Sequence, residues 1–239
     1  MLNVLFLGNS LMFYNDMPAL FASIAKAEGR EVNVRSVTKG SATISDFADE
    51  STKVGSVAIP LLKEQAWDYV VIEPSRRISP YENSVKDAEL ASAKKLRLLA
   101  QAAGGDLLLY SVWGNDNGRV IEYRAESPIY FPEVERHAME RKPHAEFLHR
   151  VNLEFSAALG GIKVAHAGSA FESCIEKHPE LELYHTDRRH PSPIGSYLAA
   201  AVIYATIFGE PVTSIPYDIS PAPAHGLLER IANAAAGVI

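Results

Sequence analysis

The chain has 239 residues, of which 47% are hydrophobic and 22% charged, with a formal net charge of -6 and one cysteine, Cys174. These values are typical of a folded globular domain and exclude intrinsic disorder, collagen-like repeats and a disulfide scaffold. The acidic balance also excludes a general nucleic-acid binder, because such proteins neutralise phosphates with clustered Lys and Arg. A single thiol fits a reducing compartment.

Apolar runs of strand length alternate with longer helical patterns, which predicts a parallel sheet covered by helices on both faces. Strands are expected over residues 2–7, 32–37, 69–72, 107–111 and 162–165. Helices are expected over residues 17–28, 56–65, 84–103, 145–159, 169–177, 193–208 and 224–236. The sequence therefore predicts an α/β fold, with three α/β/α layers and a five-stranded, mostly parallel sheet.

The longest apolar stretch, residues 197–208, is well below the roughly 20 residues that cross a bilayer. We therefore expect a buried helix there, with Ser192 as its N-cap, Pro193 in its first turn and Gly209 at its end. The amino terminus lacks the basic region and the long apolar run of a signal peptide. A cytoplasmic protein without membrane insertion is expected.

No internal repeat and no Gly/Ser-rich or Pro-rich linker divides the chain, so a single domain over residues 1–239 is expected. The segment 114–143 is a long connection without a clear helix or strand pattern, and it contains Tyr123, Tyr130 and Phe131 among charged residues of both signs. Connections of this length are uncommon and often serve as lids or binding loops. We predict such a lid or binding loop at about residues 114–143.

The first expected strand ends in Gly8-Asn9-Ser10, which places a serine at the carboxyl end of a strand in an open α/β sheet. Ligands bind at that edge of such sheets. Gly8 allows a sharp turn, and N–H groups of the turn that follows can stabilise an oxyanion. Two other interpretations stay open: Ser10 caps a turn, or the turn binds phosphate, although neither GxGxxG nor GxxxxGK[ST] is present.

Asp187 and His190 stand three positions apart, so in a helical turn both side chains lie on one side. The carboxylate can then accept a hydrogen bond from one imidazole nitrogen and leave the other nitrogen free as a base, as in a serine-hydrolase triad. A surface ion pair and a pair of metal ligands share this spacing. His185, two residues before Asp187, is the competing candidate for the base.

Together these features resemble the SGNH (GDSL-like) hydrolase family over residues 4–208, nearly the whole chain. The Gly-Asn-Ser sequence that ends at Ser10 is similar to the first block of one branch, and Asp187 and His190 match the fifth block. The resemblance implies a flavodoxin-like fold in which Ser10 is the nucleophile, His190 the base and Asp187 the acid that orients it. Gly40 matches the second block, which implies that the Ser10 and Gly40 N–H groups form the oxyanion hole.

The third block of the family, Gly-x-Asn-Asp after the third strand, is missing at that place, where the strand runs into Glu73. A Gly-Asn-Asp sequence around Asn115 is similar to part of the motif, but it follows the fourth expected strand. Asn115 and Glu73 are therefore both candidates for the missing oxyanion donor. An ionised carboxylate would repel an oxyanion, so Glu73 either acts as a neutral acid or pairs with Arg76 or Arg77. We favour the ion pair.

Other polar residues receive structural interpretations. His137, His144, His149 and His178 lie in charged segments and are expected at the surface. Cys174 lies in a helical pattern and is expected to be a buried thiol. No HExxH or paired-Cys arrangement is present, so we predict neither a metal site nor a cofactor.

The resemblance implies a metal-independent serine esterase or O-deacetylase that cleaves a small ester through an acyl-enzyme, with acylated carbohydrates among its suggested substrates. The competing interpretation is a noncatalytic small-molecule or carbohydrate-binding protein that retains the fold, motivated by the missing third-block asparagine. The expected partner is a small ester, without nucleic acid or membrane insertion, and association into a homo-oligomer is left open.

Overall fold

A five-stranded parallel sheet lies at the centre of the computed structural model, which describes residues 1–124, 134–213 and 226–238. The strand order is β2-β1-β3-β4-β7, and every neighbouring pair is parallel. The strands are β1 (Leu2–Gly8), β2 (Val32–Thr38), β3 (Tyr69–Ile72), β4 (Asp106–Tyr110) and β7 (Val164–Ala165). This flavodoxin-like order confirms the predicted α/β fold, although β7 is two residues shorter than expected.

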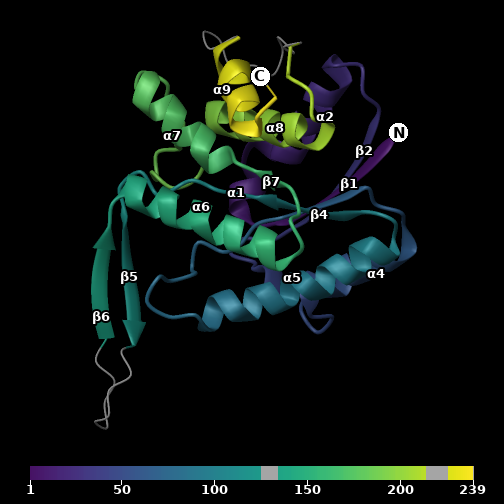
Figure 1. Ribbon diagram of the computed structural model, residues 1–239, viewed down its shortest axis with the longest axis horizontal. Coiled ribbons are helices and arrows are strands. Elements are labelled where there is room, and N and C mark those ends of the chain that lie inside the picture. The colour runs from purple at the N-terminus through teal and green to yellow at the C-terminus, as the bar shows by residue number, and fades with distance from the viewer. Residues whose placement is uncertain (125–133, 214–225, 239) are drawn as a thin grey trace.

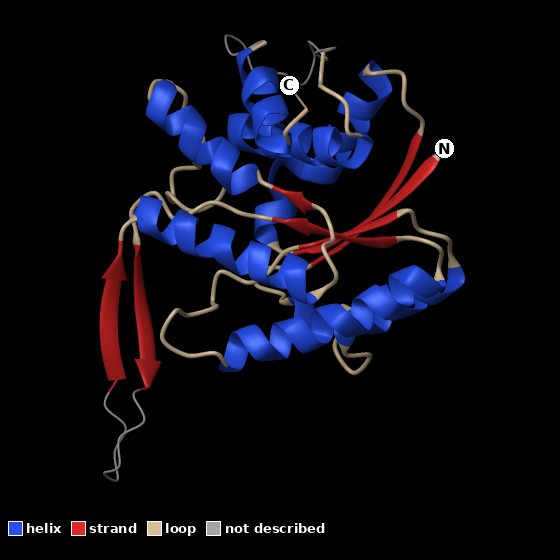
Figure 2. Ribbon diagram, in the orientation of Figure 1, coloured by secondary structure: helices blue, strands red, loops and turns tan. Residues whose placement is uncertain are grey.

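Helices cover both faces of this sheet, as Figure 1 and Figure 2 show, with α2, α7, α8 and α9 on one side and α4 and α5 on the other. The long helices are α2 (Met17–Ala27), α4 (Gly55–Glu64), α5 (Ser84–Ala102), α6 (Arg141–Ala158), α7 (Ala167–Lys177), α8 (Pro193–Phe208) and α9 (Leu227–Ala236). Shorter elements are α1 (Ser10–Phe13), the 3-10 turn η1 (Tyr14–Asp16) and α3 (Ile44–Ala48). The three predicted layers are thereby confirmed.

The central strands and α8 form the core because they are covered on every side. Residues 4–7 of β1 and 107–110 of β4 are at most 1% exposed, as fits strands of a sheet with two covered faces. The helix α8 packs against α2 and α9 and buries every residue from 195 to 205. Ser192 Oγ accepts the Gly195 N–H at 3.1 Å, and Gly209 ends the helix with φ +66°. The expected buried helix is confirmed.

The segment predicted as a lid or binding loop contains an antiparallel hairpin of β5 (Arg119–Arg124) and β6 (Val134–Met139). Figure 1 shows the hairpin projecting from one end of the molecule. Residues 125–133, which include Tyr130 and Phe131, lie outside the described residues. The start of the segment reaches the site described below, and its function as a lid stays a prediction.

One histidine that we expected at the surface is buried, so that expectation was wrong. His144 is 0% exposed and lies on the inner face of α6 together with Phe147, Val151 and Phe155. Spacings of three and four residues place these four side chains on one face of the helix. Cys174 is buried in α7, as predicted. Among the helices of the described residues, none is long and apolar enough to cross a membrane.

Candidate active site

Ser10 lies at the carboxyl end of β1, as the first residue of the short helix α1. Asn9 caps this helix, because its Oδ1 accepts the Leu11 N–H at 3.0 Å while its Nδ2 donates to the Ala42 carbonyl at 3.2 Å. A Cβ atom on Gly8 would lie 2.6 Å from Sδ of the buried Met12, so glycine lets the Met12 side chain pack against this turn. Gly8 and Asn9, the two residues before Ser10, thus fix the position of the Ser10 backbone.

Asp187 and His190 belong to a tight turn between α7 and α8. Asp187 Oδ1 accepts the backbone N–H groups of Arg189 and His190 at 3.0 and 2.9 Å, and Arg188 takes a positive φ of +58°. The indole N–H of the buried Trp113 donates to the Arg189 carbonyl at 3.1 Å. These contacts fix the turn against the end of β4, beside β1 and β3 at the same edge of the sheet.

The structure brings Ser10, Asp187 and His190 together in a hydrogen-bonded chain. His190 Nε2 lies 2.7 Å from Ser10 Oγ, and His190 Nδ1 lies 2.5 Å from Asp187 Oδ2. Tyr14 stacks on the His190 ring with centroids 4.2 Å apart and planes 5° from parallel. The imidazole is therefore held on one side by a carboxylate and on one face by an aromatic ring.

His185, the competing candidate for the base, lies outside this chain. Its Nδ1 is 3.9 Å from Asp187 Oδ1, its side chain is 50% exposed, and its hydrogen-bond partner is Thr186 Oγ1 at 3.4 Å. Among the histidines that the structure describes, His190 alone has ring nitrogens within hydrogen-bond distance of both Ser10 and Asp187. The geometry therefore favours His190.

Asp187 keeps its negative charge in this arrangement. Burial acts to raise the pKa of the Asp187 carboxyl, but hydrogen bonds from the His190 ring and from the His190 and Arg189 N–H groups outweigh burial. The pKa of Asp187 consequently lies well below its usual range. An ionised carboxylate at Nδ1 fixes the proton on that nitrogen and leaves Nε2 as the acceptor that faces Ser10.

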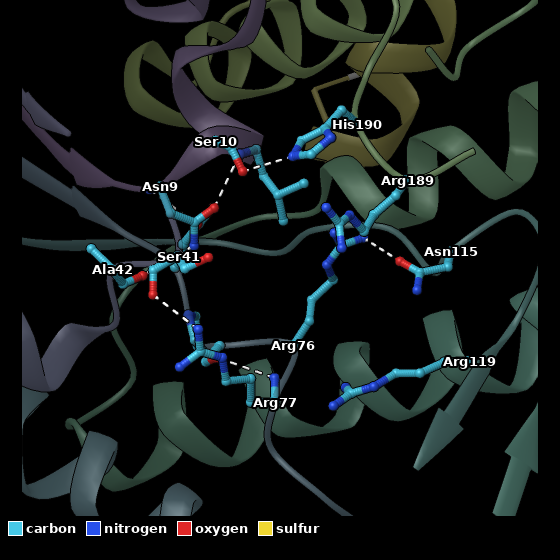
Figure 3. Close-up of a pocket in the computed structure, with 14 residues that line it drawn as sticks. Asn9, Ser10, Ser41, Ala42, Arg76, Arg77, Asn115, Arg119, Arg189 and His190 are labelled. Carbon is cyan, nitrogen blue, oxygen red and sulfur yellow. Dashed lines mark hydrogen bonds between the residues drawn. The ribbon is translucent and has the colours of Figure 1, made fainter. Parts of the chain in front are cut away.

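A cavity of about 210 Å³ opens beside Ser10 and His190 at the carboxyl edge of the sheet. Figure 3 shows Ser41 and Ala42 on the same side of the cavity as Asn9, and Arg76, Asn115 and Arg189 toward His190. The lining residues are Asn9, Ser10, Leu11, Ser41, Ala42, Glu73, Pro74, Ser75, Arg76, Arg77, Asn115, Arg119, Arg189 and His190. Loops after β1, β2, β3 and β4 thus meet in one pocket.

The structure does not place Gly40 in the wall of this cavity, which Ser41 and Ala42 form instead. Gly40 is exposed, and a Cβ added to it would meet nothing within 4 Å, so neither packing nor crowding requires a glycine at that position. Ser41 has the left-handed φ of +61° in this turn. The oxyanion contact expected of the Gly40 N–H stays a prediction, whereas the Ser10 N–H has no hydrogen-bond partner among the described residues.

Glu73 lines the cavity but does not form the ion pair that we favoured. Its carboxylate is 4% exposed, and Oε1 accepts the Asn9 N–H at 3.4 Å, while Oε2 is buried without a hydrogen-bond partner. Arg76 donates to Asn115 and Arg77 to the Ser41 carbonyl, so neither contacts Glu73 directly. Burial raises the pKa of Glu73 to about 7, although the nearby charge of Arg76 opposes the shift.

This raised pKa predicts a dependence of stability on pH. Between 4.5 and about 7 the folded protein keeps a proton on Glu73 that the unfolded chain has released, so the free energy of unfolding falls as pH rises through this window. Glu73→Gln should therefore match the wild type near pH 4 and exceed its stability by up to about 3 kcal/mol at pH 8. Urea denaturation at both pH values measures the difference.

The exposed Glu64 provides the control, because Glu64→Gln should change the free energy of unfolding little at either pH. An equal effect of Glu73→Gln at pH 4 and pH 8 would contradict the buried, titrating carboxyl. Activity tests the second role considered for this residue. If neutral Glu73 donates to the oxyanion, Glu73→Ala lowers kcat by about 10², whereas Glu73→Gln, which keeps a donor, does not.

Asn115 reaches the cavity even though it follows β4 instead of β3. Its Oδ1 accepts a hydrogen bond from Arg76 Nη1 at 2.7 Å, which leaves its amide N–H₂ group as a donor. The loop that carries it is joined to the turn of Asp187 and His190, since Asp116 N donates to the Arg188 carbonyl at 3.0 Å and the Asp116 carboxylate pairs with the Arg188 guanidinium. Asn115 thus remains a candidate donor to the oxyanion.

Our sequence reasoning missed several residues of the site. The missed residues are Tyr14, Ser41, Arg119 and Arg189, and Arg76 and Arg77 were considered only as partners of Glu73. Arg76 and Arg77 follow the third strand, and Arg189 directly precedes His190, so their position at the edge of the sheet where ligands bind was a usable signal. Tyr14 and Arg119 gave no such signal.

No protein-family model matches this chain, and no curated protein matches its sequence. Solved structures do match. A protein from Slackia heliotrinireducens, described as a candidate SGNH hydrolase, is 25% identical with a TM-score of 0.64, over 86% of this chain and 98% of that chain. A DUF4886 family protein from Bacteroides uniformis is 16% identical with a TM-score of 0.70, over 98% of this chain and 93% of that chain.

An acetylxylan esterase from Geobacillus stearothermophilus, solved as a catalytic mutant, is 14% identical with a TM-score of 0.58, over 87% of this chain and 94% of that chain. These structures define the class of fold, an α/β sandwich with a flavodoxin-like parallel sheet. More particularly, the chain has the fold of the SGNH hydrolases. The resemblance stated from the sequence is confirmed.

Proposed function

We propose that the chain is a serine esterase of the SGNH type that removes a short acyl group, such as acetyl, from a small hydroxylated compound. One observation carries this proposal: Ser10 Oγ lies 2.7 Å from His190 Nε2, while His190 Nδ1 is hydrogen-bonded to Asp187. A serine hydroxyl is a weak nucleophile until a neighbouring base accepts its proton. The three side chains have the contacts which that activation requires.

In the first half of the reaction, Ser10 Oγ attacks the ester carbonyl carbon while its proton passes to His190 Nε2. The negative charge of Asp187 stabilises the imidazolium. The tetrahedral intermediate then collapses, the bond to the alcohol oxygen breaks, and His190 returns the proton to that oxygen. In the second half, His190 takes a proton from water as the water oxygen attacks the acyl carbon. The bond between Ser10 Oγ and the acyl carbon then breaks, His190 returns the proton to Oγ, and the carboxylic acid leaves.

The oxyanion that forms on the carbonyl oxygen needs hydrogen-bond donors. The Ser10 N–H is available, since it has no partner among the described residues. The Asn115 amide and the protonated Glu73 carboxyl are further donors in the wall of the cavity, and Gly40 N–H remains the donor that the family resemblance implies. The site therefore has other candidate donors to the oxyanion, although the third-block asparagine is missing.

The size of the cavity favours a small ester. About 210 Å³ beside Ser10 accommodates an acetyl group and part of an alcohol. Acetylxylan is the substrate that the name of the Geobacillus protein gives, so an O-acetylated carbohydrate is a reasonable substrate class to test first. We propose an acyl-enzyme intermediate, with neither metal nor cofactor, because the three side chains supply nucleophile, base and orienting acid.

Hydrolysis of 4-nitrophenyl acetate, followed before and after treatment with a fluorophosphonate, tests this function. We expect hydrolysis to disappear in proportion to labelling, and mass spectrometry of peptides to locate the label on Ser10. Ser41 and Ser75 line the same cavity and serve as internal controls, because neither is hydrogen-bonded to a histidine within the described ranges. An unlabelled and inactive protein would favour the noncatalytic binding protein instead.

A further inference from the structure

Four arginine side chains line the small cavity beside the proposed nucleophile. They come from separate segments: two from the loop after β3, one from β5 and one from the turn before α8. The four are Arg76, Arg77, Arg119 and Arg189. Figure 3 shows their side chains around the same opening. Because the whole chain has a net charge of -6, this concentration of positive charge is a local feature of the site.

None of the four arginines forms an ion pair with a described residue. Arg76 donates to Asn115 Oδ1 at 2.7 Å, and Arg77 donates to the Ser41 carbonyl at 3.3 Å. Arg119 Nη1 is buried and has no hydrogen-bond partner in the described part of the chain. Since a guanidinium has five N–H donors, most of the donors of these arginines have no partner among the described residues.

Several arginines elsewhere in the described residues are paired, whereas Arg35, Arg150 and Arg230 form no ion pair with a described residue but are exposed to solvent. Arg97 contacts Asp106 with two hydrogen bonds of 2.8 Å, Arg141 pairs with Glu172, and Arg188 lies between Asp116 and Glu182. The carboxylates of these pairs lie outside the cavity, whose described lining has one carboxyl group, that of Glu73. The cavity is therefore distinguished by four guanidinium groups that line one small space without an ion pair to a described residue.

Gathering these charges is electrostatically unfavourable. Burial lowers the pKa of Arg76 to about 10, the Glu73 carboxylate opposes that shift, and the neighbouring Arg189 and Arg119 charges lower it further. The cavity offers limited compensation, because Glu73, whose pKa is raised to about 7, carries its negative charge mainly above neutral pH, and Asp187 is engaged by His190. A bound anion would relieve this repulsion with charge-assisted hydrogen bonds.

The position of the arginines indicates which part of an ester they contact. His190 returns its proton to the alcohol oxygen, so the alcohol part must lie on the His190 side of the scissile bond. Figure 3 shows Arg76 and Arg189 on that side and Ser41 and Ala42 on the other. The acyl group faces the less charged wall.

We propose that the substrate is an acidic ester, whose alcohol part carries a carboxylate or phosphate group that Arg76, Arg119 and Arg189 bind. This inference rests on the proposed function and adds the substrate class. Guanidinium groups suit both anions because their N–H donors match two oxygens at once. An acetylated hydroxy acid, an acetylated acidic sugar and an acetylated sugar phosphate all fit the description.

A matched pair of esters tests the proposal. 3-Acetoxybenzoate and its methyl ester share the acetyl group and the phenol, and differ in the remote carboxyl, which is charged in one and methylated in the other, so release of the phenol is the reaction to follow in both. We expect kcat/KM to be about 10- to 100-fold higher for the anion, the scale of one or two hydrogen bonds to a charged group. Sodium chloride at 0.5 M should reduce this ratio, because salt screens the attraction. 3-Acetoxyphenyl phosphate determines whether phosphate is preferred over carboxylate.

Variants locate the effect. Arg119→Gln and Arg189→Gln should each lower the anion-to-neutral ratio of kcat/KM at least about fivefold, whereas Arg35→Gln, an exposed residue of β2 outside the cavity, should leave the ratio unchanged. Equal kcat/KM values for the two esters would overturn the proposal. 4-Nitrophenyl hemisuccinate carries its charge on the acyl part. A higher kcat/KM for this ester than for 4-nitrophenyl acetate would overturn the placement of the anion on the alcohol part.

Binding separates this inference from the proposed function. In a Ser10→Ala protein, calorimetry with 3-acetoxybenzoate and its methyl ester measures recognition without turnover. Tighter binding of the anion, weakened by a second change Arg119→Gln, would support the anion site even if the wild type hydrolysed neither ester. Indistinguishable binding of the two esters would reject the anion site while leaving the esterase proposal intact.

Discussion

Ser10→Ala should lower kcat for a short acetate ester by at least about 10³ without changing the fold. The Ser10 hydroxyl contacts His190 Nε2 at 2.7 Å and supplies the only atom proposed to attack the carbonyl carbon. The local backbone does not depend on that hydroxyl, because Asn9 caps α1. The free energy of unfolding should thus stay within about 0.5 kcal/mol of the wild type.

Steady-state kinetics and urea denaturation of the same preparation measure both effects. Ser23→Ala is a matched control, since this serine lies in α2, outside the cavity, and its replacement should alter neither quantity. A correctly folded Ser10→Ala protein that retains more than about a tenth of the activity would show that another group is the nucleophile.

Much of the fold could be predicted because its signals are local. The apolar strands β1, β3 and β4 are buried on both faces, and their runs of Val, Leu and Ile stand out from the polar turns between them. Ser192 and Gly209 mark the ends of α8 by their capping chemistry. Short elements gave no such signal: α1 and α3 have four and five residues, too few for a helical period.

The grouping of Ser10, Asp187 and His190 could be predicted from sequence patterns, but the rest of the site could not. Asp187 and His190 are three residues apart, and Ser10 closely follows the end of a strand. By contrast, the arginines of the cavity come from distant segments, and only the fold brings them together. Asn115 follows the fourth strand instead of the third, which argued against its presence at the site. It lines the cavity nevertheless, because the loop after β4 lies at the same edge of the sheet.

Glu73 shows why a residue type alone does not determine a role. The sequence places Arg76 and Arg77 within four residues of it, which favoured an ion pair. In the structure the two guanidinium groups turn to Asn115 and to the Ser41 carbonyl, and Glu73 accepts the N–H of Asn9. Side-chain direction, which depends on the folded loop, decides between a charged partner and a buried, protonated carboxyl.

His190→Ala should also lower kcat by at least about 10³, whereas His185→Ala should leave a readily measurable enzyme. His190 bridges Ser10 and Asp187, while His185 is half-exposed and 3.9 Å from the nearest Asp187 oxygen. Loss of one triad member removes most of the cooperative catalysis, because the base, the nucleophile and the orienting acid act as a unit.

The dependence of kcat/KM on pH separates a catalytic His190 from a merely structural one. A general base must be neutral to accept the serine proton, so wild-type kcat/KM should rise with pH on the acid side of the profile. This rise should persist in His185→Ala and be absent from the residual activity of His190→Ala. Asp187 contributes no rise of its own near neutral pH, since hydrogen bonds hold its pKa well below its usual range. A rise retained in His190→Ala and lost in His185→Ala would instead assign the base to His185.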